Sequence, residues 1–164
     1  MYKYEKIVIP LLLGAILFSA CARPAPGGFR GMMWGAENKS FPDLVYNSTD
    51  PNHGGVKFYT KKDDNLHIGN FVAEKIIYGF WHEKLCSVGV FVEGNVNWEG
   101  LKQAAFEKFG SQPDSDLDSF YWSNDSTIIS LDREVHQKGV LWLRSREIAN
   151  QQEAYDRNKA KEGL

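Results

Sequence analysis

Apolar and polar positions alternate with a period of two through most of the middle of the chain, a pattern that predicts β-strands. The first clear strand is expected at residues 56–60. A polar run at residues 63–65 indicates a turn before a short apolar segment at residues 66–68. A longer strand, with apolar residues on both faces, is expected at residues 71–81.

A hairpin is expected to join this long strand to a partner at residues 85–93. The intervening residues 82–84 are polar and form a short reversal, so the two strands must pair antiparallel. The predicted hairpin therefore spans residues 76–93.

The period changes from two to that of an α-helix after the hairpin. A helix is expected at residues 97–109, with Asn95 or Asn97 as its N-terminal cap and Gly110 at its C-terminal end. Its apolar stripe follows the spacing i, i+3, i+7, i+11 and consists of Trp98, Leu101, Ala105 and Phe109.

Two further strands and a polar helix complete the predicted elements. The strands are expected at residues 120–132, with a bend near Asn124, and at residues 139–145. Residues 146–161 favour a helix with few apolar residues, which is expected to pack weakly. We therefore predict an α+β fold, a small antiparallel sheet with one amphipathic helix packed on one face, plus a polar C-terminal helix.

Five tryptophans lie in this part of the chain and are expected either to fill the space between helix and sheet or to line a surface groove. They are Trp34, Trp81, Trp98, Trp122 and Trp142.

The N-terminus has the pattern of a secretory signal. Two lysines precede an apolar segment at residues 7–20 that carries no charge and ends in small residues. A helix over that segment would be only about 21 Å long, short of the roughly 30 Å hydrocarbon core of a bilayer. Residues 1–20 are therefore predicted to be a signal peptide rather than a permanent membrane span.

The run Leu17-Phe18-Ser19-Ala20-Cys21 resembles the lipobox of bacterial lipoproteins, although Phe18 departs from the usual leucine. The resemblance implies cleavage between Ala20 and Cys21 and a diacylglyceryl group on the Cys21 thiol. Ala22 implies the outer membrane, with the domain facing the periplasm, if the host has two membranes. An ordinary signal peptide with an incidental cysteine is the alternative.

Proline and glycine in residues 21–28 predict a flexible tether, followed by a globular domain at residues 29–145 and the polar helix or tail at residues 146–164. The segment Phe29-Arg30-Gly31-Met32-Met33-Trp34-Gly35 resembles the opening of a group of bacterial exported domains and lipoproteins. That resemblance implies no particular activity.

Charge and cysteine content narrow the classes of function. The chain has 19 Lys and Arg against 21 Asp and Glu, so composition gives no reason to expect nucleic-acid binding. Acylation of Cys21 would leave Cys86 unpaired, which excludes an intramolecular disulfide. Cys86 alternates with valines in a predicted strand and is expected to be a small buried residue; a reactive thiol is the alternative.

Motifs for catalysis, metal binding or cofactor binding are not found in the sequence, so we predict no catalytic, metal or cofactor residues. The histidines lack metal-ligand spacing, and they are His53, His67, His82 and His136. An alternating acidic run suggests calcium, but it lacks the glycine and glutamate of an EF-hand loop and is interpreted as a solvated loop; it contains Asp114, Asp116 and Asp118.

The preferred interpretation is a non-catalytic, lipid-anchored protein of the cell envelope. It would contact the membrane through its N-terminal lipid and bind an envelope protein as an accessory subunit. The alternative is a hydrolase or small-ligand receptor whose pocket combines His82 and Glu83 with an aromatic wall of Trp81 and Tyr78.

Overall fold

The computed structural model describes residues 27–112, 118–133 and 137–163. The predicted signal peptide, Cys21 and residues 22–26 of the tether lie outside these ranges. Asp114, Asp116 and His136 lie outside them as well.

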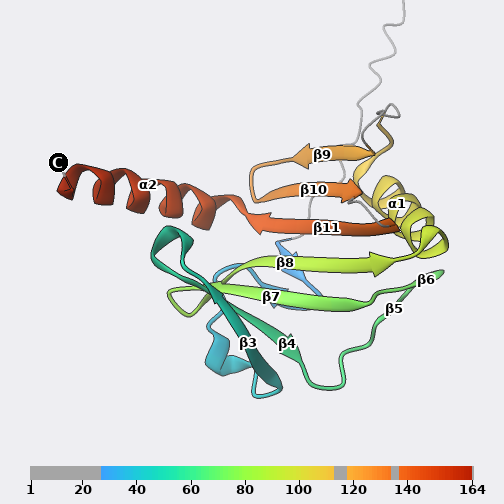
Figure 1. Ribbon diagram of the computed structural model, residues 1–164, viewed down its shortest axis with the longest axis horizontal. Helices are drawn as coiled ribbons and strands as arrows, with labels where there is room; N and C mark the ends of the chain where they lie inside the picture. Colours follow the sequence, from blue (N-terminus) through green and yellow to red (C-terminus); the bar gives the residue numbers. More distant parts are fainter. Residues whose placement is uncertain (1–26, 113–117, 134–136, 164) are drawn as a thin grey trace, which may run out of the picture.

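A seven-stranded antiparallel sheet forms the centre of the molecule, in the order β3-β4-β7-β8-β11-β10-β9 (Figure 1). Two short hairpins, β1-β2 and β5-β6, lie outside this sheet. The strands are β1 (Gly28–Phe29), β2 (Met32–Met33), β3 (Leu44–Asp50), β4 (Val56–Lys61), β5 (His67–Ile68), β6 (Phe71–Val72), β7 (Lys75–Trp81), β8 (Lys84–Glu93), β9 (Ser119–Ser123), β10 (Thr127–Arg133) and β11 (Lys138–Ser145). The helices are the single 3-10 turns η1 (Asn38–Ser40) and η2 (Asn52–Gly54), and the α-helices α1 (Asn95–Phe109) and α2 (Arg146–Glu162).

The α+β class is confirmed, but the sheet is larger than predicted. Strand β3 was not expected, and the strand predicted at residues 120–132 is in fact the β9-β10 hairpin. The reversal occurs at Asn124, whose side-chain Oδ1 accepts hydrogen bonds from the backbone N–H groups of Ser126 and Thr127, each at 2.9 Å. An Asx turn of this kind reverses the chain completely, where the sequence suggested only a bend.

The hairpin predicted at residues 76–93 is confirmed as β7-β8. His82 and Glu83 both have positive φ angles, 47° and 65°, as a two-residue hairpin turn requires. The strand predicted at residues 71–81 is interrupted after Val72, because β6 pairs with β5 and not with the large sheet.

Helix α1 forms where the apolar stripe predicts it, but its N-terminal cap differs. Gly94 occupies the cap position with φ +84°, and no side chain caps the helix. The Asn97 amide instead donates to the Glu93 carbonyl at 3.0 Å and accepts from the Val72 N–H at 3.1 Å, linking α1 to β6. At the other end, Gly110 has φ +103° and its N–H donates to the Phe106 carbonyl, as expected of a terminating glycine.

The main hydrophobic core lies between α1 and one face of the sheet. Trp98 is fully buried, and its ring lies so close to Gly139 of β11 that a Cβ at that glycine would be 2.3 Å from Trp98 Cε3. Gly139 therefore makes room for the largest side chain of the core. The sheet residues packed in this core include Ile76, Tyr78, Phe80, Val88, Val90, Val92, Ile129, Leu131, Leu141 and Leu143.

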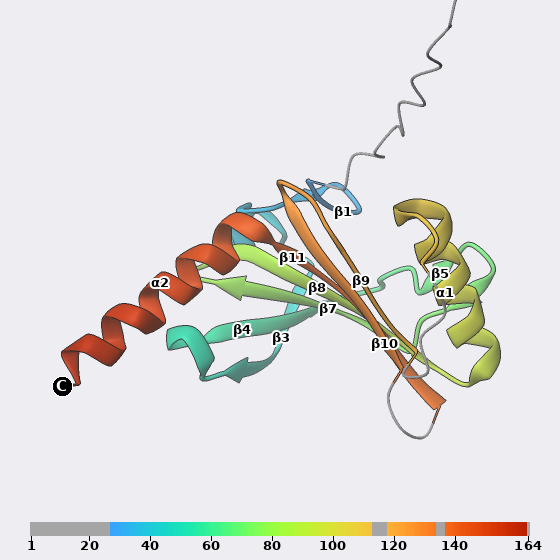
Figure 2. The ribbon, with the colours of Figure 1, turned by 90° about the horizontal axis from the view of Figure 1, so that it is seen from above.

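A second, smaller core lies on the opposite face, below the first turns of α2. Val56, Trp81, Cys86 and Ile148 are buried together there. Ser145 caps α2 by accepting a hydrogen bond from the Ile148 N–H at 3.3 Å. The start of α2 thus packs more firmly than its polar sequence suggested, whereas residues 156–163 are exposed and the helix extends away from the sheet (Figure 2).

The tryptophans divide between the two faces, so both expectations for them hold. Trp98, Trp34 and Trp122 pack in the core beside α1. Trp81 belongs to the second core, and Trp142 lines a cavity on that face.

No helix in the described ranges is both long and apolar enough to cross a membrane.

Candidate functional site

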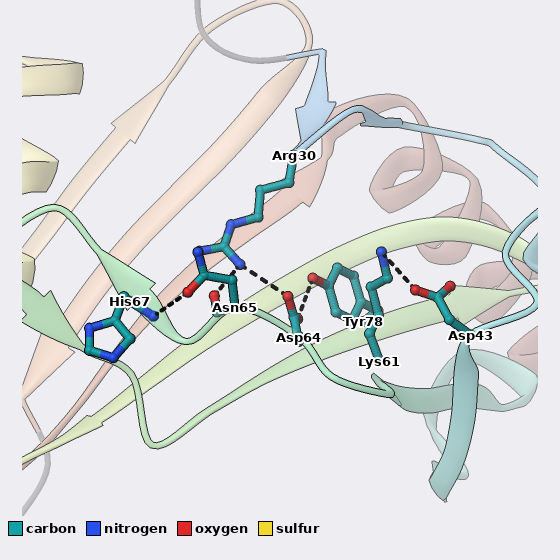
Figure 3. Close-up of polar contacts among 7 residues, drawn as sticks. All are labelled: Arg30, Asp43, Lys61, Asp64, Asn65, His67 and Tyr78. Carbon is teal, nitrogen blue, oxygen red and sulfur yellow. Dashed lines mark hydrogen bonds and ion pairs between the residues drawn. The ribbon is translucent and has the colours of Figure 1, made fainter.

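A polar cluster fixes the β1-β2 hairpin beside the core (Figure 3). Arg30, at the hairpin turn, donates to the Asp64 carboxylate at 3.0 Å and to the Asn65 carbonyl at 2.6 Å. The hydroxyl of buried Tyr78 donates to the other oxygen of Asp64 at 2.8 Å. Burial, followed by this hydrogen bond, raises the pKa of Tyr78, so the phenol remains a neutral donor. The cluster therefore ties the β1-β2 turn to the loop that contains Asp64 and Asn65.

The opening segment at residues 29–35 has a structural role. Trp34 Nε1 donates to Thr127 Oγ1 at 2.9 Å, and the Gly35 N–H donates to the Leu85 carbonyl at 2.9 Å. These bonds attach the segment to β10 and β8. The segment at residues 29–35 thus closes one end of the core.

The aromatic pocket expected around His82 and Glu83 does not form. Tyr78 faces the core beside α1, whereas Trp81 lies on the opposite face and its indole donates to the His53 carbonyl at 2.7 Å. Glu83 is exposed and pairs with Lys57 at 2.8 Å, a contact that lowers the pKa of the Glu83 carboxyl. A strand places residues three apart on opposite faces, which separates Tyr78 from Trp81.

Cys86 is buried, as predicted, but it faces the side opposite its valine neighbours. Gly79 pairs with Ser87 and Phe80 pairs with Leu85, so Cys86 is the extra residue of a β-bulge. Burial raises the pKa of its thiol to about 11, and the thiol donates to the Gly79 carbonyl at 3.3 Å. A neutral, bonded thiol is a poor nucleophile.

The histidines that the structure describes, His53, His67 and His82, do not gather with other ligands. His53 contacts Asp156 at 2.5 Å, joining η2 to α2. Across residues 27–112, 118–133 and 137–163, no group of three or more His, Cys, Asp or Glu could hold a metal ion. Asp118 lies instead 3.2 Å from Arg133 in an ion pair.

The two edges of the large sheet differ in how their backbone groups are satisfied. At β9, the Gln112 side chain accepts from the Tyr121 N–H at 3.3 Å and donates to the Tyr121 carbonyl. This amide occupies the hydrogen-bonding positions that a further strand would use. The β9 edge is therefore blocked at its centre.

The opposite edge, β3, is open. In the described part of the chain, its residues 45–49 make no backbone hydrogen bonds outside the pairing with β4. Val45 and Tyr46 are 51% and 57% exposed. The Tyr46 ring packs edge-on against Tyr59, which packs in turn against Phe80 of the core. The edge thus combines unpaired backbone groups with an aromatic side chain anchored to the core.

Sequence reasoning missed this edge because β3 has no buried face to impose an alternating pattern. Leu44 and Asp50 at the two ends of β3 are half-buried, and residues 45–49 between them are exposed. The signals that could have revealed it are the β-favouring run Leu44-Val45-Tyr46 and the prolines at positions 42 and 51 on either side.

Comparison with models of protein families, with curated proteins and with solved structures found no match to this chain.

Proposed function

We propose that the protein is a non-catalytic, lipid-anchored component of a bacterial cell envelope that binds a partner protein along the β3 edge. The open β3 edge is the observation that carries the binding role. The anchoring role rests on the resemblance of residues 17–21 to a lipobox. If the host has two membranes, Ala22 favours an outer-membrane protein facing the periplasm.

Strand addition is the binding mode that this edge favours. An extended segment of a partner pairs its backbone with the free N–H and C=O groups, while its side chains meet those of the edge strand. Val45 and Tyr46 supply apolar contact area, and Tyr46 is held in place by Tyr59. The partner is therefore expected to contribute an extended, partly apolar segment.

Site-specific photo-cross-linking in intact cells tests this proposal. A photoreactive residue at Val45 or Thr49 of β3 is expected to give one reproducible adduct. The same residue at Tyr121, on the blocked β9 edge, is the matched control because Tyr121 is equally exposed at 56%. Loss of the adduct on introducing Tyr46→Lys would support strand addition at β3.

Two outcomes contradict the proposal. The first is an absence of adducts from every β3 position in cells that produce the protein at its natural level. The second is an adduct of the same mass from Tyr121 as from Val45, since contact at the blocked edge cannot arise from a strand added to β3.

A further inference from the structure

A cavity of about 240 Å³ lies on the face of the sheet opposite α1, beside the start of α2. Its walls come from β4, β8, β10, β11 and α2, elements that are distant in sequence. Its lining includes Phe58, Ser87, Ser130, Trp142, Arg144 and Gln152.

Two glycines make room for the aromatic part of the wall. A Cβ at Gly89 would be 2.8 Å from Trp142 Cζ3, and a Cβ at Gly79 would be 3.0 Å from Phe58 Cε1. The two rings therefore lie directly over the backbone of β8 and β7, with their centroids 6.3 Å apart. They present a fixed apolar surface to the cavity.

The polar part of the wall includes an accessible amide that has no partner among the described residues. Gln152 is 7% exposed, lines the cavity and makes no hydrogen bond to any residue that the structure describes. The hydroxyl of half-buried Ser130 is also unbonded within those residues. The amide atoms of Gln152 remain accessible, and because the residue lines the cavity they can bond a ligand there.

The charge of the cavity is positive. Arg144 is exposed and has no ion pair or hydrogen bond within the described residues. No aspartate or glutamate lines the cavity, and His53 on its wall is already paired with Asp156. A guanidinium without a carboxylate partner beside an apolar surface favours an organic anion.

We propose that this cavity binds a small organic carboxylate with a flat ring, the ring lying against Trp142 and the carboxylate on Arg144. Gln152 bonds a polar substituent of the ring. A cavity of about 150 Å³ holds benzene, so this one accommodates a ligand of roughly ten non-hydrogen atoms. The proposal does not depend on the lipid anchor or on a partner at β3.

Titration of the full chain in detergent with benzoate, phenylacetate and 4-hydroxybenzoate tests the proposal. Nuclear magnetic resonance would follow the Trp142 indole N–H and the Gln152 side-chain amide, assigned with Trp142→Phe and Gln152→Leu. We expect saturable shifts of both signals with 4-hydroxybenzoate. Its neutral counterpart, 4-hydroxybenzamide, should bind at least about tenfold more weakly, because it forms no charge-assisted bond with Arg144.

Matched variants separate the site from general effects of charge. Arg144→Gln should weaken 4-hydroxybenzoate binding at least about tenfold, a factor that corresponds to one charge-assisted hydrogen bond. Arg157→Gln removes an exposed arginine of α2 that does not line the cavity, and it should leave binding unchanged. Both residues are exposed, so the variants should retain the wild-type thermal midpoint.

Three results would overturn the proposal. One is the absence of saturable shifts with all three carboxylates. Another is equal binding of 4-hydroxybenzoate and 4-hydroxybenzamide, and the third is unchanged binding in folded Arg144→Gln. None of these bears on cross-linking at β3, so the two proposals can fail separately.

Discussion

At the scale of single residues, the buried hydroxyl of Tyr78 shows how a polar group can stabilise an apolar core. Its side chain is fully buried, and its O–H donates to Asp64, which also holds Arg30 (Figure 3). One hydrogen bond thus connects β7 to the loop that secures the β1-β2 hairpin.

Tyr78→Phe is expected to lower the free energy of unfolding by about 2 kcal/mol, since a bond to a charged acceptor is lost and Asp64 remains half-satisfied. Urea unfolding measures the change. Tyr121→Phe is the control, because the Tyr121 side chain is exposed. Equal stability of Tyr78→Phe and wild type would show that the hydroxyl contributes nothing.

The Cys86 thiol predicts a pH dependence of stability. Its pKa is raised from 9.0 to about 11 in the folded chain, so the unfolded chain ionises first as the pH rises. The free energy of unfolding is therefore unaffected by this thiol at pH 8 and falls by about 2 kcal/mol by pH 10.5. Tyr78, whose pKa is also raised, adds a loss of the same sign at high pH.

The comparison of Cys86→Ala with its parent isolates the contribution of the thiol. Both chains carry Cys21→Ser, so that Cys86 is the only cysteine in the parent. Urea unfolding at pH 8 and pH 10.5 should show a smaller loss in Cys86→Ala. A parallel decline in the two chains would contradict burial of the thiol.

At the scale of elements, α2 combines a packed beginning with an exposed end. Ile148 is buried with Val56 and Trp81, whereas residues 156–163 are exposed. Most of the stability of a helix in a protein comes from tertiary packing, so the packed end is what stabilises α2.

Ile148→Ala should therefore lower the free energy of unfolding by about 2–4 kcal/mol, whereas removal of residues 157–164 should change it by less than about 0.5 kcal/mol. Urea unfolding of the two variants measures both changes in the free energy of unfolding. A larger loss from the truncation would mean that the exposed end of α2 has contacts of its own.

The elements that the sequence predicts well are those with buried apolar residues; α1 buries one face, whereas β7 and β8 have buried residues on both faces. The stripe of α1 and the β7-β8 hairpin follow directly from apolar spacing, because burial imposes that spacing. Strand β3 could not be found in the same way, since its middle residues are all exposed. The face of the sheet to which Cys86 points could not be predicted either, because a β-bulge depends on how two strands pair.

The cavity was beyond sequence reasoning for a related reason. Trp142 and Gln152 belong to β11 and α2, while Phe58 and Ser87 come from strands far earlier in the chain. Only the strand order brings these side chains together. The pocket expected at Trp81 and Tyr78 does not form, because successive side chains of a strand point to opposite faces of the sheet.

At the scale of the whole molecule, the described chain enters the body on the α1 side of the sheet. The Gly27 carbonyl accepts from the Trp34 N–H at 2.9 Å, and Phe29 packs in the core beside α1. The cavity lies on the opposite face, and β3 lies at one edge of the sheet. The N-terminal end of the described chain, the cavity and the open β3 edge thus occupy separate parts of the molecule.

The chemical state of the N-terminus is the measurement that tests the account most directly. Mass spectrometry of the N-terminal peptide of the protein isolated from its natural membranes should show a chain that begins at Cys21 with a diacylglyceryl thioether. A chain that retains Met1, or one that begins at Cys21 with a free thiol, would contradict lipid anchoring and with it the proposed place of this protein in the envelope.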